Sequence, residues 1–241
     1  SLKDLESING QDLGAEKYIA IMIDGIEFAK RTIVVALGVT VPGKKHILGL
    51  RDGATENAEV CTDLLESIVE RGFSLACESL LCVLDGAKAL KSAVKRVFGS
   101  RAAIQRCYLH KQRNITSYLS KEYHPELSRR VKTMMNMNSY EDGFVELTRL
   151  QEWLDTINIE AAGSLREVGE DLLTVHKLGV VGPLRQSLNS TNLIESIFST
   201  VRTKCSRVKN WKTSSDARLR WVASAVKAQE PRMRSVRGVA K

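Results

Sequence analysis

The sequence predicts an α/β fold built on a mixed β-sheet with helices packed against it. Three apolar segments follow one another near the start of the chain, separated by short polar turns, which is typical of an antiparallel meander. Helical periodicity then alternates with short apolar runs, which is typical of strand–helix–strand units with parallel strands. The 241 residues suffice for one large domain, or for one domain that carries an insertion.

The first three strands are expected within residues 17–28, 31–41 and 46–50. Residues 18–23 form a continuous apolar run, which fits a strand buried on both faces. The second segment is rich in β-branched residues, and Pro42-Gly43 predicts the turn to the third. The elements that follow are a helix, a strand, a second helix and a short strand, expected at residues 55–71, 80–84, 87–98 and 102–104.

Strand signals stop near residue 115, and helical patterns continue to residue 176, which predicts a helical insertion. A last helix follows, with Ser190 or Thr191 as its N-cap. We therefore divide the chain into an N-terminal lead-in that is a candidate for disorder, a first part of the core, a helical insertion, the final helices of the core and a basic C-terminal tail, at residues 1–16, 17–114, 115–185, 186–228 and 229–241.

Composition argues against a membrane or secreted protein. No apolar segment approaches the ~20 residues that span a bilayer, and residues 1–14 are too polar for a signal peptide. The five cysteines are odd in number and scattered, which fits reduced thiols. We therefore expect a protein of the bacterial cytoplasm or nucleoid, without a membrane partner.

Positive charge is concentrated at the C-terminal end. The net charge is +8, and residues 201–241 hold twelve Lys and Arg against two acidic residues. Such asymmetry indicates a polyanionic partner, most often a nucleic acid. The alternative is a solvated basic tail without a partner.

Two Asp-Gly pairs close apolar runs, at Asp24-Gly25 and Asp85-Gly86. A carboxylate at the end of a buried strand costs free energy unless it has a partner. Asp24-Gly25 also fits a hairpin turn, and the first pair alone does not decide between these readings. The second pair precedes a helical pattern, so Asp85 is expected where a parallel strand opens on a ligand crevice.

A third carboxylate, Glu195, lies beside the apolar stripe of the last predicted helix. At 100° per residue, Asn192, Glu195, Ser199 and Arg202 form one polar strip next to that stripe. Glu195 can therefore face a crevice while the helix packs on the sheet. A solvated surface position is the ordinary alternative for a single flanking glutamate.

The order of a three-stranded meander, helix, strand, helix and strand is that of an RNase H-like fold. In that fold the first and fourth strands are neighbours, which would bring Asp24 within a few ångströms of Asp85. Two such carboxylates repel each other unless cations intervene. Carboxylate oxygens suit Mg²⁺, with Mn²⁺ as a substitute, so the sequence predicts a divalent metal site.

Five stretches in the same order resemble the catalytic core of mutator-type insertion-sequence transposases, the bacterial relatives of Mutator-like elements. The similarity spans roughly residues 17–228 and is carried by "YIAIMIDGIEF", "GLRDGATENAEVCTDLL", "VLDGAKALKSAV", "QRCYLHKQRN" and "STNLIESIFSTVRT". The resemblance implies that Asp24, Asp85 and Glu195 are the catalytic metal ligands. It also implies that Cys107 and His110 form a C-x-x-H feature that supports the site, and that the helices before Glu195 are the family's insertion.

The resemblance implies a DDE transposase domain that cleaves DNA and transfers strands. Two metal ions would activate the nucleophile on one side of a phosphodiester and stabilise the leaving oxygen on the other. The expected partners are transposon ends, target DNA and further copies of the chain in a dimer or higher oligomer. Two rivals stay open: an RNase H-like nuclease that hydrolyses DNA without strand transfer, and a domesticated DNA-binding protein without catalysis. Full-length relatives carry a DNA-binding region before the core, so we expect this chain to be a core alone or a decayed element.

Further residues are expected near the site. Cys107 and His110 could ligate zinc, but no second ligand pair is present in the sequence, so local packing beside the carboxylates is favoured. Trp211 and Trp221 are expected to be core residues rather than base contacts. The basic residues expected to contact DNA are Arg106, Lys111, Arg113, Arg202, Lys204, Arg207 and Lys209.

Overall fold

The computed structural model describes residues 1–28, 31–206 and 216–239, which fall into two compact units. The first unit contains residues 1–103 and the C-terminal residues from 191 onward, and the second contains residues 104–190. None of the helices in the described ranges is long and apolar enough to cross a membrane.

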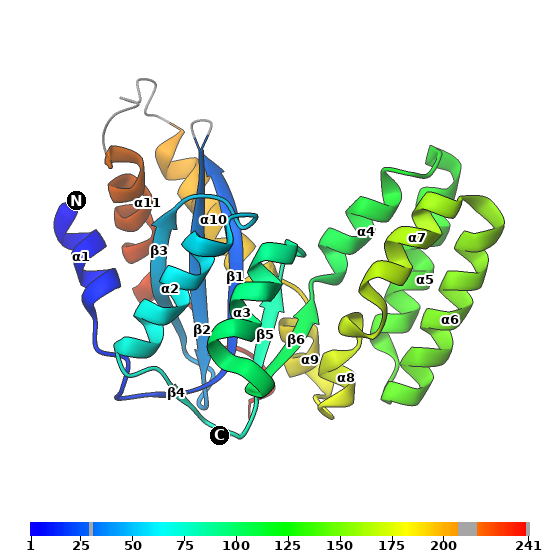
Figure 1. Cartoon of the computed structure of the whole chain (residues 1–241), viewed down its shortest axis with the longest axis horizontal. Coiled ribbons are helices and arrows are strands. Elements are labelled where there is room, and N and C mark those ends of the chain that lie inside the picture. The colour runs from blue at the N-terminus through cyan, green and yellow to red at the C-terminus, as the bar shows by residue number, and fades with distance from the viewer. Residues whose placement is uncertain (29–30, 207–215, 240–241) are drawn as a thin grey trace. The chain divides into compact units, whose positions relative to one another are not determined.

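A mixed β-sheet forms the centre of the first unit (Figure 1), as the sequence predicts. The strand order is β3-β2-β1-β5-β6, and β4 also pairs with β1. β1 pairs antiparallel with β2, and β2 with β3, whereas β4 and β5 run parallel to β1. The strands are β1 (Lys17–Phe28), β2 (Arg31–Thr40), β3 (Lys45–Asp52), β4 (Ser74–Leu75), β5 (Leu80–Leu84) and β6 (Ala102–Arg106).

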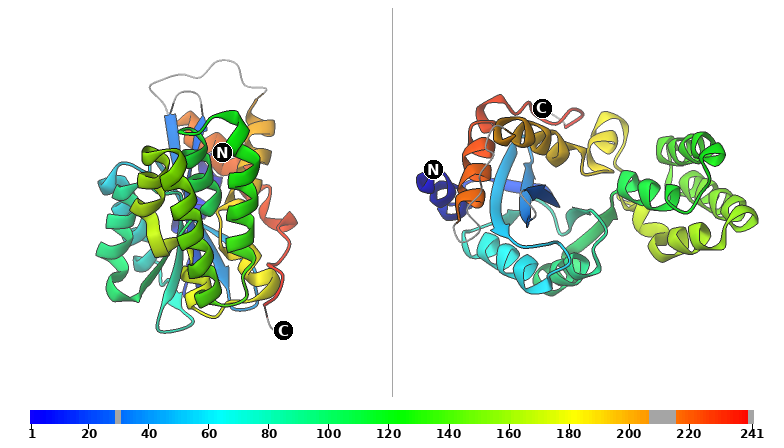
Figure 2. Two further views of the ribbon diagram at one scale, coloured as in Figure 1. Left: turned by 90° about the vertical axis from the view of Figure 1, so that its right-hand side faces the viewer. Right: turned by 90° about the horizontal axis from the view of Figure 1, so that it is seen from above.

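Helices cover both faces of this sheet (Figure 2). On one face, α2 (Ala58–Glu70) and α3 (Lys88–Phe98) contact each other, with α2 against β3 and α3 against β5. On the other face, α10 (Asn192–Cys205) contacts β1, and α11 (Ala217–Lys227) contacts both α10 and β3. Apolar side chains of the strands fill both interfaces, and residues such as Ile21, Ile23 and Val35 are fully buried.

The lead-in, a candidate for disorder from its sequence, contains the helix α1 (Leu2–Gly10). α1 contacts β3 and α11, and Ile8 is completely buried. The Asn9 amide exchanges two hydrogen bonds with the backbone of Leu50, at 3.0 and 3.2 Å, and so satisfies backbone groups on the edge strand β3. These tertiary contacts, rather than a strong periodicity, explain why the pattern alone did not predict α1.

The second unit is helical apart from its first residues in β6 (Figure 1). Its core is apolar and includes Leu127, Leu150, Leu154 and Leu165, with Trp153 packed against it. The α-helices are α4 (Tyr108–Thr116), α5 (His124–Asn136), α6 (Tyr140–Ile157), α7 (Ile159–Val168), α8 (Thr174–Lys177) and α9 (Gly182–Leu188). Four 3₁₀ turns complete the described chain: η1 (Gly99–Arg101), η2 (Lys121–Tyr123), η3 (Gly169–Leu172) and η4 (Glu230–Arg232).

Candidate active site

Asp24 lies inside β1, because the strand continues past it to Phe28. Asp24 pairs with Val35 and Gly25 with Val34 on β2, so the alternative of a hairpin turn at Asp24-Gly25 is wrong. The glycine serves close packing instead: a Cβ on Gly25 would lie 2.8 Å from the Thr32 Cγ2 atom. Asp24 is only 5% exposed, which makes it a buried carboxylate in the middle of a strand.

The parallel pairing of β1 with β5 sets the position of Asp85 relative to Asp24. Ile23 is the partner of Leu84 in this ladder, and β5 ends at Leu84. Asp24 and Asp85 therefore each follow a residue of the last β1–β5 pair, and the backbones of two neighbouring strands lie ~4.8 Å apart in a sheet. Asp24 thus marks the end of the β1–β5 pairing rather than the end of β1.

Two donors from the protein hold the Asp85 carboxylate. Its Oδ2 atom accepts a hydrogen bond from the Thr55 hydroxyl at 2.8 Å, and its Oδ1 atom accepts one from the backbone N–H of Ala87 at 2.9 Å. Gly86 has a φ of +132°, which only glycine adopts readily, and this lets the chain turn from β5 toward α3. The second Asp-Gly pair is therefore a strand-to-helix turn, as predicted.

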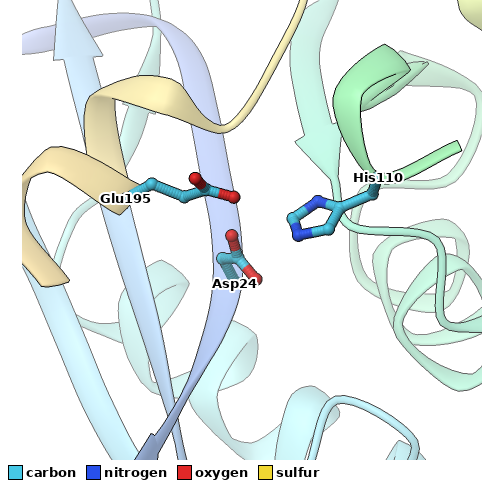
Figure 3. A group of neighbouring side chains, drawn as sticks. All are labelled: Asp24, His110 and Glu195. Carbon is cyan, nitrogen blue, oxygen red and sulfur yellow. The ribbon is translucent and has the colours of Figure 1, made fainter. Parts of the chain in front are cut away.

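Glu195 stands in the first turn of α10, which contacts β1. The helix buries Ile194, Ile197 and Phe198 against the unit's core, and Glu195 is partly buried beside them. In Figure 3 the Glu195 and Asp24 side chains point toward one another. Their carboxylate oxygens lie within 4.8 Å, although 170 residues separate them in the sequence. This group of close ligand atoms does not include Asp85.

Cys107 and His110 belong to the second unit, where they open α4. Cys107 is the N-cap residue of α4 and is completely buried, and His110 follows in the first turn and is partly buried. Figure 3 labels His110 together with the two carboxylates. The role of Cys107 and His110 as supporting residues stays a prediction.

Two of the basic residues predicted to contact DNA are buried. Arg106 is 4% exposed and Lys111 is also 4% exposed, and both pair with the Glu167 carboxylate, at 3.5 and 2.7 Å. The Lys111 ammonium also donates to the Ser164 carbonyl at 3.0 Å. Because both side chains are buried and paired with Glu167, they present no surface to a DNA phosphate, and the prediction for these two residues is corrected.

The other basic candidates are divided between surface and undescribed positions. Arg113, on α4, is exposed, as are Arg202 and Lys204, two and more turns after Glu195 on α10. Arg207, Lys209 and Trp211 lie outside the described residues. Trp221 is 48% exposed on α11, so the expectation that it is a core residue is wrong.

Thr55 is a site residue that the sequence analysis did not identify. It is 4% exposed in the segment between β3 and α2, and its hydroxyl donates to Asp85. The pattern placed it at the start of a helix, whereas α2 begins at Ala58 after the N-cap Asn57, whose side chain accepts from the N–H groups of Glu59 and Val60. An isolated threonine before a helix carries no signal that distinguishes a carboxylate partner from a cap.

Comparison with known proteins decides the family. The family model described as "Transposase, Mutator family" matches residues 9–230, most of the chain. The chain belongs to the Mutator family of transposases. This confirms the resemblance seen in the five sequence stretches.

Curated relatives of this Mutator-family chain are transposases of bacterial insertion sequences. The transposase for IS6120 of Mycolicibacterium smegmatis is 29% identical over 83% of this chain and 62% of its own length. The transposase for IS1201 of Lactobacillus helveticus is 24% identical over 79% of this chain and 52% of its own length. The transposase for IS256 in transposon Tn4001 of Staphylococcus aureus is 29% identical over 70% of this chain and 42% of its own length. The chain therefore spans about half the length of these relatives.

Proposed function

We propose that the chain is the catalytic domain of a DDE transposase, which cleaves DNA and joins the freed strand to a target during transposition. The observation that carries the proposal is the approach of the Asp24 and Glu195 carboxylates within 4.8 Å, from a strand and a helix far apart in sequence. Family membership and the insertion-sequence transposases among its relatives support the same activity. The sheet order, with β5 parallel to β1, supports an RNase H-like architecture for the first unit.

The donor set fits divalent metal. Two carboxylates that approach within 4.8 Å disfavour each other's ionised form unless positive charge lies nearby. Oxygen donors of this kind are those that Mg²⁺ and Mn²⁺ prefer. Asp24 and Glu195 would hold the metal, and Asp85 would join them from the end of β5. When bound, two such ions would activate a water or a 3′-hydroxyl and stabilise the leaving oxygen of a phosphodiester.

The residues of this chain supply rigidity and orientation. Asp24 is fixed by ladder pairing with β2, and α10 fixes the position of Glu195 by packing on β1. Thr55 and the N–H of Ala87 each occupy one lone pair of an Asp85 oxygen, which leaves further lone pairs on both oxygens for a ligand. Once these residues hold the nucleophile and the phosphate in line, the reaction needs little from the protein besides neutralisation of the phosphate charge.

A strand-transfer assay tests the proposal against both rivals. The chain is incubated with Mg²⁺, a labelled duplex carrying a transposon end, and a target plasmid, and the products are separated on a denaturing gel. We expect both cleaved strands and longer joined products. Cleaved strands without joined products would assign the chain to hydrolytic nucleases, and DNA binding without cleavage would assign it to binding proteins.

Thr55 is predicted to position Asp85. Thr55→Val keeps the side-chain shape but removes the hydroxyl, so Asp85 loses one of its two donors and is held by the Ala87 N–H alone. We expect the cleavage rate to fall about fivefold, because one such hydrogen bond contributes about 1 kcal/mol. Thr55→Ser restores the hydroxyl and should restore the rate. Equal losses in both variants, or a lower melting temperature that accounts for the loss, would make Thr55 a packing residue only.

Arg202 and Lys204 are predicted to contact DNA phosphates beside Glu195. Replacing both with Gln should weaken binding and make the slope of log affinity against log salt less negative by about 1.8, because each duplex phosphate contact contributes ~0.9. The matched control is Lys95→Gln with Arg96→Gln, which removes the same charge from exposed positions on α3, on the opposite face of the sheet. The slopes are obtained from affinities measured by fluorescence anisotropy at several salt concentrations. Equal slopes for the two double variants would contradict the prediction.

A further inference from the structure

The C-terminal segment after α11 is packed on the turn between β2 and β3. The Val236 N–H donates to the Gly43 carbonyl at 2.8 Å, and the Val236 side chain is buried. Gly43 has a φ of +79°, and a Cβ there would lie only 3.1 Å from the Val236 carbonyl oxygen. The 3₁₀ turn η4 also contacts β3. The described part of the basic tail is thus held against the first unit.

A cavity of about 380 Å³ lies where this segment meets the turn. Its acidic lining residue, Glu230, pairs with Lys227 at 2.7 Å, so this carboxylate is already balanced from α11. Lys44 pairs with Glu16 at 3.4 Å, which leaves Lys45 as the lining cation without a counter-charge. The described residues that line the cavity are Gln11, Lys44, Lys45, His46, Glu230, Met233 and Ser235.

Lys45 is the lining residue that points to an anion. Its side chain is partly buried at the start of β3, and burial lowers the pKa of the ammonium. This ammonium has no hydrogen bond or ion pair to any described residue. Its Nζ atom keeps solvent-accessible surface, so a ligand in the cavity can reach it. A partly desolvated charge without a partner costs free energy, and an anion in the cavity would offset that cost.

His46 can supply a second donor beside Lys45. Its Nδ1 atom lies 3.2 Å from the Tyr18 hydroxyl. Burial raises the pKa of Tyr18 to about 12, so this hydroxyl stays protonated at neutral pH and can donate to Nδ1. The neutral His46 ring then carries its proton on Nε2, as a donor suited to an anion.

Three arginines of the same segment extend the positive charge beyond the cavity. Arg232, Arg234 and Arg237 are exposed, and none of them has an ion pair with a described residue. Arg234 lies between two lining residues of the cavity. One small anion would fill the cavity without these arginines, whereas a chain of phosphates would meet both. We call the whole group the tail surface: Lys44, Lys45, His46, Arg232, Arg234 and Arg237.

The tail surface lies at the end of the sheet opposite Asp24. The Val41 N–H donates to the Lys17 carbonyl at 3.0 Å, which places the β2–β3 turn beside the start of β1. The left view of Figure 2 shows the red C-terminal segment at the lower end of the sheet. Asp24 lies seven residues after Lys17 on the same strand, which is ~23 Å at ~3.3 Å per residue. This distance equals about seven base pairs of duplex DNA.

We propose that the tail surface binds the phosphate backbone of the DNA on which the chain acts, as a second contact at least about seven base pairs from the phosphodiester that is cut. The proposal rests on the proposed function, because it takes DNA as the substrate. Contacts to phosphates position a duplex without reading its bases. This second contact would therefore fix the direction in which the duplex crosses the carboxylates.

The variants that test the proposal are Lys45→Gln and the double variant Arg234→Gln with Arg237→Gln. Their affinities for a labelled duplex of about 30 base pairs are measured by fluorescence anisotropy between ~50 and ~200 mM salt. Each lost contact should make the slope of log affinity against log salt less negative by ~0.9. Over this range, the ratio of unaltered to variant affinity should shrink about 3.5-fold for Lys45→Gln and about 12-fold for the double variant.

Matched controls remove the same charge elsewhere in the first unit. Lys3→Gln, at an exposed position of α1, is the control for Lys45→Gln. Lys95→Gln with Arg96→Gln, at exposed positions of α3, is the control for the double variant. Both controls should keep the slope of the unaltered chain. Lys45→Gln removes no ion pair, so its melting temperature should be maintained.

Acetylation of lysines gives a readout at the tail surface itself. The unaltered chain is treated with acetic anhydride with and without the duplex, and mass spectrometry of its peptides reports the acetylation of each lysine. The duplex should protect Lys45 and should leave Lys3 as reactive as before. This measurement needs no variant, so it does not depend on how a substitution affects the fold.

Unchanged slopes in both tail-surface variants, or equal acetylation of Lys45 with and without the duplex, would overturn the proposal, whether the surface then binds an acidic protein or nothing. Inorganic phosphate at fixed ionic strength should not release the duplex. Release by phosphate from the unaltered chain, but not from Lys45→Gln, would assign the cavity to a free anion and also overturn the proposal. Failure of the proposed function looks different: the duplex would protect Lys45, but no cleaved or joined DNA would form with Mg²⁺.

Discussion

Asp24→Asn and Glu195→Gln are each expected to reduce DNA cleavage by at least ~1,000-fold, because each would replace a charged ligand of the proposed metal site with a neutral amide. The two carboxylates lie within 4.8 Å of each other, so each variant removes one charge from the proposed metal site. Rates are measured with labelled duplex DNA at saturating Mg²⁺. The control is Glu66→Gln, which makes the same chemical change at an exposed position of α2.

A second measurement separates loss of the metal site from loss of the fold. The melting temperature of each variant is first compared with that of the unaltered chain in the absence of metal, and similar values show that the fold is retained. Addition of Mg²⁺ should raise the melting temperature of the unaltered chain, because a ligand that binds only the folded state stabilises it. The variants should lack this increase. Cleavage near the original rate in either variant would remove that residue from the site.

Most strands and helices of the first unit were predictable, because their apolar side chains form continuous runs or repeat with a helical period. The run that contains Ile21 and Ile23 is buried on both faces, and the structure confirms a mixed α/β sheet flanked by helices. α1 was not predictable, because its stability comes from Ile8 and from Asn9 bonded to a strand about 40 residues away. Periodicity reports which face of an element is apolar, and it does not report such long-range partners.

The candidate site was predictable in part. Asp24, Asp85 and Glu195 could be chosen because a carboxylate after an apolar run, or beside an apolar stripe, is conspicuous. The detail of how each one is held was not predictable: β1 continues past Asp24, and Thr55 donates to Asp85. The basic residues were the least predictable. A lysine looks the same in sequence whether it meets DNA or, like Lys111, a buried carboxylate.

Replacement of Glu167 is expected to lower the stability of the second unit, because Glu167 pairs with the buried Arg106 and Lys111. The Glu167 carboxylate pairs with the Lys111 ammonium at 2.7 Å and with the Arg106 Nη1 atom at 3.5 Å, and the Arg106 Nε atom has no hydrogen-bond partner among the described residues. Burial by itself would raise the pKa of Glu167, but the Lys111 hydrogen bond and the two positive charges lower it overall. The folded second unit therefore favours the ionised carboxylate.

This pKa shift determines how stability depends on pH. A carboxyl group whose pKa is lowered on folding contributes stability above its unfolded pKa, and the contribution is lost as the pH falls through its folded pKa. Glu167 should therefore stabilise the second unit at neutral pH and cease to do so under acidic conditions. The stability difference between the unaltered chain and a Glu167 variant should shrink in that acidic range.

Glu167→Gln should destabilise the second unit by about 2–3 kcal/mol at neutral pH. Loss of one partner from a buried ion pair costs about 3–5 kcal/mol, because the remaining charges stay buried, and Glu167 is 39% exposed, so water screens part of this effect. Trp153 packs against the core of this unit, and replacing Trp211 and Trp221 with Phe makes its fluorescence report urea unfolding there alone. Glu152→Gln, at an exposed position of α6, is the control and should change stability by less than about 0.5 kcal/mol. An equally small change for Glu167→Gln would show that Arg106 and Lys111 are stabilised by other groups, and would reopen both side chains as candidates for DNA contact.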